Sequence, residues 1–266
     1  MMQSITDLRH LNWSVNPHET KGTAGTFLKA EHGRNYYKLS QYNKVSKVYG
    51  HESVLEVIAC RFITALGIEC VKYNLIHGLV KVDDDEFETF ACISEEYKKQ
   101  GESKLNLDIY YEKHRLPGES TIEFCHRLGF ENVINELLLV DFIIASRDRH
   151  GANIELLKDS KSNLRIAPIF DNGVSLTSPY YTEADLERFD WKSDIAGNNF
   201  LGTQSLRENL KYITSPVIVN TVDESAINSV LNDFEGVLSA KHLQTIKEML
   251  LWRYDYAKQQ NVLVER

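Results

Sequence analysis

The stretch from Glu131 to Ser146 limits the possible folds of this chain more than any other part of the sequence. Its side chains are apolar around most of a helical circumference, so the predicted helix has no broad polar face to turn toward water. Such a helix must lie in a core, and the other elements must surround it. Its apolar run from Leu137 to Val140 is broken by Asp141 and resumes only to Ala145, and no apolar run in the chain is longer than four residues. A membrane-spanning helix needs roughly 18 apolar residues, so we expect no membrane span.

The composition of the chain excludes several other classes of protein. Its 266 residues are 42% hydrophobic and 10% aromatic, which is too rich in core-forming side chains for a disordered protein. The 30 basic and 38 acidic side chains give a net charge of −8, which argues against direct binding of nucleic acid. The 4 cysteines have no C-x-x-C spacing, and the opening MMQSITDLRH has no apolar core of a secretion signal. We therefore expect reduced thiols and a cytoplasmic location.

The first part of the chain, residues 1–95, is predicted to form strands around one helix. From Gly50 to Leu66, apolar residues recur at three- and four-residue steps, and Gly67 stands where a glycine often ends a helix. The acidic run Asp83-Asp84-Asp85 is typical of an exposed turn between two strands. The predicted strands are Thr26–Ala30, Asn35–Ser40, Val71–Leu79 and Phe87–Ile93.

The pattern changes after Glu95. The polar stretch from Glu95 to Leu107 is predicted to be a linker, and residues 96–266 are predicted to be mainly helical. The further elements that we expect are helices at Glu119–Arg127 and Ala240–Lys258, and strands at Asn153–Leu157 and Leu164–Ile169. The sequence thus predicts an α/β fold of two lobes. Residues 1–95 would form a small mixed-sheet lobe and residues 96–266 a larger helical lobe, with a ligand held between them.

The most informative motif follows the buried helix. In SRDRHGANIELLKDSKSNLRIAPIFDNG, Asp148 precedes Asn153 by five positions, and Asp171 follows after a predicted hairpin. Phosphoryl transfer uses these residue types: one carboxylate accepts the proton of the attacking hydroxyl, while an amide oxygen and a second carboxylate hold magnesium on the nucleotide. The interval from Asp148 to Asn153 is that of a kinase catalytic loop. Asp171-Asn172-Gly173 takes the place of Asp-Phe-Gly, with Asn172 in the aromatic position.

This region resembles the HipA-like kinase family. The resemblance rests on DFIIASRDRHGANIELL and LRIAPIFDNG, supported upstream by YYKLS, GHESVLEVIACRF and FACISEEY. The Asp-Arg-His-x-x-Asn pattern is also similar to that of phosphatidylinositol kinases. The chain looks most like short HipA-like kinases, which lack an extra N-terminal subdomain. The resemblance implies a protein-kinase-like fold, ATP and Mg²⁺ as cofactors and a protein serine or threonine as acceptor, and it leaves room for a companion chain of the toxin–antitoxin kind.

The resemblance also implies a set of site residues. Asp148 would be the general base, and Asn153 and Asp171 would be the magnesium ligands. Lys38 would contact the α- and β-phosphates, held by a glutamate from the following helix. The remaining candidates are Glu56 or Glu52 as that glutamate, Gly22, Thr23 and Gly25 in a phosphate-covering loop from Thr20 to Thr26, and Glu95 and Tyr97 in a hinge that contacts adenine.

Several alternatives stay open from the sequence. Glu52 and Glu56 lie one turn apart on the same helical face, so either could pair with Lys38. An unpaired carboxylate at Asp141 would be costly in the core, so we interpret it as a buried brace for an arginine or for the catalytic-loop backbone. His150 is interpreted as structural. A phosphatidylinositol kinase and a catalytically silent nucleotide-binding module are the competing functions.

Overall fold

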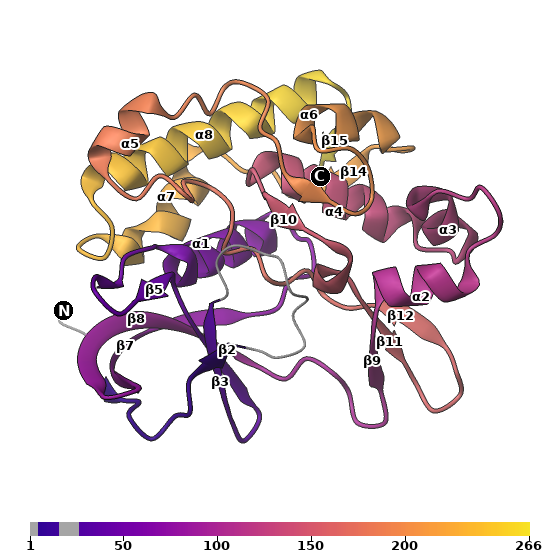
Figure 1. Ribbon diagram of the computed structural model, residues 1–266. Coiled ribbons are helices and arrows are strands. Elements are labelled where there is room, and N and C mark those ends of the chain that lie inside the picture. Colours follow the sequence, from indigo (N-terminus) through magenta and orange to yellow (C-terminus); the bar gives the residue numbers. More distant parts are fainter. Residues whose placement is uncertain (1–4, 16–26) are drawn as a thin grey trace.

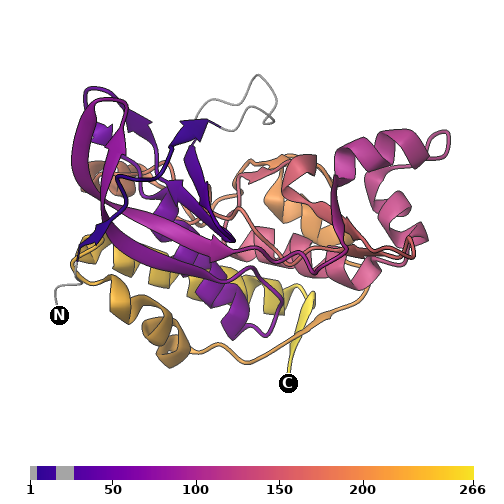
Figure 2. The same ribbon diagram turned by 90° about the horizontal axis from the view of Figure 1, so that it is seen from below.

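The computed structural model describes residues 5–15 and 27–266 of the chain, which form a mixed α/β structure (Figure 1). Figure 2 shows the main sheet on one side of the molecule and helices α2 (Leu107–His114) and α3 (Thr121–Arg127) on the opposite side. Within the described residues, no helix is long and apolar enough to cross a membrane. The division of the chain at residue 95 into two domains stays a prediction.

The main sheet has six strands in the order β1-β7-β8-β4-β3-β2. β1 runs parallel to β7 and the other neighbours are antiparallel, so the sheet is mixed, as predicted. The expected hairpin is present, with longer strands than the sequence pattern indicated. The strands are β1 (Thr6–Asp7), β2 (Ser14–Val15), β3 (Leu28–His32), β4 (Asn35–Leu39), β7 (Tyr73–Val82) and β8 (Asp85–Glu95).

Helix α1 (Glu52–Ala65) covers one face of this sheet. Its apolar side chains, among them Leu55, Ile58 and Phe62, are fully buried, and each contributes about 1.5–3 kcal/mol of stability. The helix ends before Gly67, whose φ of 82° lies in the left-handed region that glycine adopts at little cost. Leu8 and Leu11 belong to a separate, smaller apolar cluster with residues of β3, β4, β7 and β8.

A second sheet corrects the prediction of a linker from Glu95 to Leu107. Within that stretch, β9 (Ser103–Asn106) pairs with β11 (Glu155–Lys158), which pairs in turn with β12 (Leu164–Ile166). Strand β9 is short and polar, and its hydrogen-bonding partner lies about fifty residues away in sequence, so local pattern does not reveal it.

Helix α4 (Glu131–Ile143) is the buried helix that the sequence predicts. It packs against α3, α6 (Leu206–Asn209) and α8 (Ala240–Gln259), and its residues from Leu137 to Ile143 are all buried. In Figure 1, α8 runs across the top of the molecule. The remaining elements are α5 (Glu183–Arg188), α7 (Glu224–Leu231), β5 (Tyr42–Asn43), β6 (Lys47–Val48), β10 (Asp148–Arg149), β13 (Asn198–Asn199), β14 (Val217–Val219) and β15 (Leu263–Glu265).

Candidate active site

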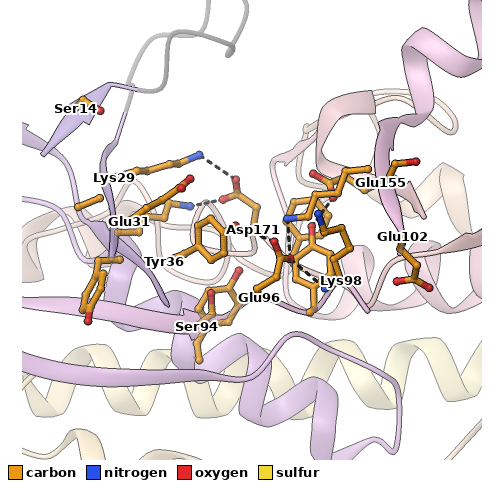
Figure 3. Close-up of a pocket in the computed structure, with 18 of the residues that line it drawn as sticks. Ser14, Lys29, Glu31, Tyr36, Ser94, Glu96, Lys98, Glu102, Glu155 and Asp171 are labelled. Carbon is orange, nitrogen blue, oxygen red and sulfur yellow. Dashed lines mark hydrogen bonds and ion pairs between the residues drawn. The ribbon is translucent and has the colours of Figure 1, made fainter. Parts of the chain in front are cut away.

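A cavity of about 790 Å³ lies between the main sheet and the second sheet (Figure 3). Its walls come from β3, β4 and β8 on one side and from β9, β11 and the segment Phe170-Asp171 on the other. The predicted site residues that line this cavity are Lys38, Tyr97 and Asp171, and Glu56 contacts Lys38 from α1. Asp148 and Asn153 are not among the lining residues.

Glu95 was also predicted to lie in the hinge, but its side chain is exposed and does not line the cavity. Its neighbours Ser94 and Glu96 line the cavity instead. The alternation of a strand explains this, because successive side chains point to opposite faces.

Lys38 lies on β4 with only 8% of its surface exposed. Its Nζ donates a hydrogen bond to Oδ1 of Asp171 and lies 3.6 Å from Oε2 of Glu56. Burial alone would lower the pKa of Lys38, but the charges of Asp171 and Glu56 outweigh it and hold that pKa above its ordinary value. Lys38 therefore remains protonated in the cavity, as a group that binds phosphate must.

Of the two candidate glutamates on α1, the one beside Lys38 is Glu56. Its carboxylate also accepts hydrogen bonds from the backbone N–H groups of Asn172, at 2.7 Å, and Gly173, at 2.9 Å. Glu52 is equally buried but faces elsewhere, accepting bonds from the hydroxyl of Tyr181 and from the backbone N–H of Gln41. The structure thus resolves an alternative that helical spacing alone could not resolve.

Gly173 allows α1 to come this close. A Cβ built on Gly173 would lie 2.8 Å from the backbone oxygen of Glu52, closer than such atoms normally approach. Any larger residue would push the start of α1 away from the segment that carries Asp171. The glycine is therefore required by packing, whatever its part in chemistry.

The predicted catalytic loop joins β10 to a short 3-10 helix at Gly151–Asn153. The side chain of Asn153 donates from Nδ2 to the backbone oxygen of Asp148 at 2.8 Å, which fixes the distance between the two residues. Burial, together with the charge of Asp171, raises the pKa of Asp148 above its ordinary value. His150 lies 3.8 Å from the Asp148 carboxylate. Asp148 is thus a stronger base than an exposed aspartate.

Asp171 lies opposite this loop, and the backbone there is strained. Its φ of 55° lies in the left-handed region, which is uncommon for a residue other than glycine. Burial alone would raise the pKa of Asp171, but the positive charges of Lys38 and Lys29 outweigh it and lower that pKa well below its ordinary value. The carboxylate is therefore ionised at neutral pH, as a metal ligand must be.

A fully buried arginine connects the predicted catalytic loop to the segment that carries Asp171. Arg149 makes a salt bridge of 2.9 Å to Asp141 on α4, which confirms the interpretation of Asp141 as a brace for an arginine. The same guanidinium donates to the backbone oxygens of Asn153 and Phe170 and to Oδ1 of Asn172. Sequence reasoning left Arg149 without a role, because arginine is common on surfaces and only its neighbours in space distinguish this one.

Asn172 fills the position that an aromatic residue takes in Asp-Phe-Gly. It is fully buried, accepts from Arg149 at 2.8 Å and donates from Nδ2 toward Glu56 at 3.4 Å. Its side chain thus connects the arginine brace to the glutamate that pairs with Lys38. An apolar ring could not make these bonds, and this explains the departure from the usual motif.

Aromatic side chains line part of the cavity. Tyr97 stacks on Phe170 with ring centroids 5.8 Å apart, and its hydroxyl donates to Glu155. Lys104 lies 4.3 Å from the centroid of the Tyr97 ring, and Tyr36 donates to Glu96 at 2.9 Å. Flat apolar faces next to polar side chains suit a nucleotide base, which stacks and hydrogen-bonds at once. The sequence indicated Tyr97 but neither Tyr36 nor Phe170.

The predicted phosphate-covering loop, Thr20–Thr26 with Gly22, Thr23 and Gly25, lies outside the described residues. Among residues 5–15 and 27–266, no group of three or more His, Cys, Asp or Glu side chains is placed to hold a metal ion. The donors that are present fit a magnesium ion shared with phosphate, which needs few protein ligands. Asp171 offers a carboxylate, and because the nitrogen end of Asn153 donates to the loop backbone, its oxygen end is the atom that could bind a metal ion.

Comparisons with known proteins bear on the fold of the chain. No model of a protein family matches the chain, and no curated protein matches it in sequence. The crystal structure of the Helicobacter pylori proinflammatory kinase CtkA is similar with a TM-score of 0.65 and 16% identity, over 97% of this chain and 98% of that one. HipA in the Shewanella oneidensis complex with HipB and operator DNA matches with a TM-score of 0.42 and 14% identity, over 96% of this chain and 70% of that one. The chain thus has the fold of a known kinase structure, as its motifs predict.

Proposed function

We propose that this protein is an ATP- and Mg²⁺-dependent kinase that phosphorylates serine or threonine hydroxyls of proteins. The observation that carries the proposal is the position of Lys38, buried between Glu56 and Asp171 at the wall of a cavity large enough for a nucleotide. In protein kinases a strand lysine, a helix glutamate and a metal-binding aspartate have this relation. These three residues come from segments that are distant in the sequence. A lysine placed on the surface by chance would not have two such partners.

The nucleotide would lie with its base against Tyr97 and Phe170 and its phosphates toward Lys38. Bound Mg²⁺, held by Asn153 and Asp171, would neutralise charge on the phosphates. Lys38 would orient the α- and β-phosphates, and Glu56 would keep the lysine in place. The arginine brace would hold Asn153 and Phe170 at a fixed separation through their backbone oxygens.

Asp148 would act on the acceptor. Its carboxylate would accept the hydroxyl proton while the hydroxyl oxygen forms a bond to the γ-phosphorus. The bond from that phosphorus to the β–γ bridging oxygen breaks, and ADP leaves. The raised pKa of Asp148 makes the carboxylate a better proton acceptor than an ordinary aspartate, provided that the pH keeps it ionised.

A protein acceptor is preferred to a lipid on grounds of charge. A lipid kinase at an anionic membrane gains about 1 kcal/mol for each well-placed basic side chain. This chain has a net charge of −8, and its densest basic stretch, Lys21 to Lys47, includes Lys38 and the predicted phosphate-covering loop. A companion chain of the toxin–antitoxin kind and a cytoplasmic location stay predictions from the sequence.

The direct test is transfer of radiolabelled γ-phosphate in the presence of Mg²⁺. Myelin basic protein and phosphatidylinositol vesicles serve as alternative acceptors, and Asp148→Asn is compared with wild type. Asp84→Asn is the matched control, because Asp84 is an exposed aspartate in the turn between β7 and β8. We expect label on serine or threonine of the protein with wild type and the control, but not with Asp148→Asn.

Two results would contradict the proposal. Label on the vesicles alone, with none on any protein including the kinase itself, would make this a lipid kinase. Nucleotide binding without transfer to any acceptor would favour the catalytically silent module.

A further inference from the structure

A second lysine reaches the carboxylate of Asp171. Lys29 on β3 stands directly opposite Lys38 on β4 in the antiparallel register, so both side chains leave the same face of the sheet. The Nζ of Lys29 lies 3.8 Å from Oδ2 of Asp171, while Lys38 binds Oδ1. Figure 3 shows Lys29 extended across the cavity toward Asp171. Each oxygen of the proposed metal ligand therefore faces a different ammonium group.

The position of Lys29 is suited to phosphate. It lines the same cavity as Lys38, and its side chain is 27% exposed against 10% for Lys38, so it lies nearer the opening. In the sequence it lies three positions after Thr26, the last residue of the predicted phosphate-covering loop. A nucleoside triphosphate carries several negative charges, and one buried lysine neutralises only part of them. The general kinase arrangement explains Lys38 but does not require a second lysine on the neighbouring strand.

We propose that Lys29 is a second phosphate-binding lysine, and that Lys29 and Lys38 together occupy both oxygens of Asp171 until a nucleotide binds. The proposal rests on the proposed function, because the ligand is the triphosphate of that reaction. It adds a consequence for the order of binding. The metal and the nucleotide bind with positive coupling, since the phosphates draw the two lysines away from the carboxylate that the metal needs.

Charge explains the coupling. A divalent cation that approaches Asp171 alone meets two ammonium groups within 4 Å of the carboxylate, in a partly buried site where such repulsion is stronger than in water. When the triphosphate is bound, the ammonium groups have new partners, and the phosphate oxygens themselves become metal ligands. Asp171 then takes part in the metal site without leaving either lysine unpaired.

The test measures binding and needs no turnover. Calorimetry gives the affinity for Mn²⁺ alone and for a non-hydrolysable ATP analogue with Mg²⁺, in wild type and in Lys29→Met. Loss of one charge-assisted contact should weaken binding of the analogue by about tenfold or more. The same substitution should strengthen binding of Mn²⁺ alone by about threefold or more, because one competing cation is gone. The two affinities are thus expected to change in opposite directions.

Two further variants sharpen the result. Lys29→Arg keeps the positive charge and should bind the analogue within about threefold of wild type. Lys81→Met removes an exposed lysine from β7 and should change neither affinity. Thermal unfolding checks that each variant is folded, and Lys29→Gln replaces Lys29→Met if the latter does not fold.

The outcomes separate this inference from the proposed function. If wild type binds the analogue and Lys29→Met binds both ligands as wild type does, the phosphate role of Lys29 is wrong while the kinase proposal stands. If both affinities weaken together, Lys29 only supports the fold of the site and the inference is overturned. If wild type binds no nucleotide at all, the proposed function itself fails.

Discussion

Two buried charge clusters lie side by side in this molecule, and they differ in whether their partners can change. The lysine cluster consists of Lys38, Lys29, Glu56 and Asp171, and the arginine cluster consists of Arg149, Asp141 and Asn172. In the arginine cluster the side chains are at most 1% exposed, and the guanidinium bonds to protein groups from several segments. In the lysine cluster, three of the four side chains line the cavity.

The difference shows how one kind of interaction can serve two purposes. A buried ion pair whose partners are all within the protein fixes backbone geometry, and removing one partner leaves an uncompensated charge. An ion pair at a cavity wall can exchange its protein partner for a ligand at little cost. The arginine cluster therefore supports the fold, and the lysine cluster is available for binding. The predictions that follow test this division.

The largest expected effect is on stability. Arg149→Met leaves Asp141 buried without its partner and removes the bonds to the loop backbone, so we expect the free energy of unfolding to fall by about 3–5 kcal/mol. Urea denaturation followed by circular dichroism measures this. The matched control is Arg188→Met, because Arg188 is 75% exposed and its pair with Asp185 contributes at most about 1 kcal/mol. Equal losses in the two variants would contradict a structural role for the arginine cluster.

The next effect is on activity. Asp171→Asn should lower kcat/KM at least 100-fold, because a neutral amide is a poor ligand for a hard cation and metal charge stabilisation amounts to several kcal/mol. Stability should change less than in Arg149→Met, because Lys38 keeps Glu56 as a partner. The measurements are phosphate transfer over a range of Mg²⁺ concentrations and urea denaturation. Turnover near that of wild type with normal magnesium dependence would show that Asp171 is not a ligand.

Two carboxylates of the site should respond to pH with opposite signs. The pKa of Asp148 is raised in the folded state, so its ionised form destabilises the fold once the pH exceeds the ordinary value of 3.8. Asp148→Asn should therefore be more stable than wild type at pH 7, and the difference should vanish below pH 3.8. The pKa of Asp171 is lowered, so its ionised form stabilises the fold at pH 7 and Asp171→Asn should be less stable there.

Melting temperatures of wild type and both variants, measured from pH 3 to pH 8, test these signs. A change of about 1 kcal/mol corresponds to about 2–4 °C in a chain of this size. The wild-type kcat/KM should fall as the pH drops through a pKa above the ordinary value for aspartate, because Asp148 must be ionised to accept a proton. A gain in stability for both variants at pH 7 would mean that Asp171 is not stabilised by its lysines.

The smallest effect concerns the aromatic wall of the cavity, where we propose that the base binds. Tyr97→Phe removes the hydroxyl that donates to Glu155 but keeps the ring stacked on Phe170. We expect the dissociation constant for the ATP analogue to rise by about two- to fivefold, with no loss of the fold. Tyr97→Ala removes the ring as well and should weaken binding further, by about tenfold. Equal affinities in wild type and Tyr97→Ala would place the base elsewhere.

The parts of the fold that local pattern controls could be predicted from the sequence. The helical periodicity of α1 and α4 and the alternation of β7 and β8 gave the elements to within a few residues. Strand β9 could not be found this way, because its residues are polar and its partner β11 is distant in sequence. The pairing decides its conformation, and local propensity has little influence.

The site residues also fall into those that the sequence predicts and those that only contacts in space reveal. Asp148, Asn153 and Asp171 follow from the spacing of a motif. In the structure Asp171 lines the cavity, and Asn153 donates a hydrogen bond to the backbone of Asp148. The choice between Glu56 and Glu52 needed the contact of Glu56 with Lys38, and the role of Arg149 needed the contacts of its side chain. The position of Lys29 could have been predicted, because the tight turn between β3 and β4 fixes the pairing of Lys29 with Lys38.

The hydrogen bonds that Glu56 accepts from the backbone N–H groups of Asn172 and Gly173 have a mechanical consequence. At 2.7 and 2.9 Å they join α1 to the segment that carries Asp171, and the missing Cβ of Gly173 lets the two surfaces touch. Rotation of α1 would have to break both bonds and leave buried N–H groups unpaired. The helix and this segment therefore move as one rigid body. A widening of the cavity that keeps these bonds must then come from movement of its other walls, among them β3 and β4, the strands that carry the two lysines.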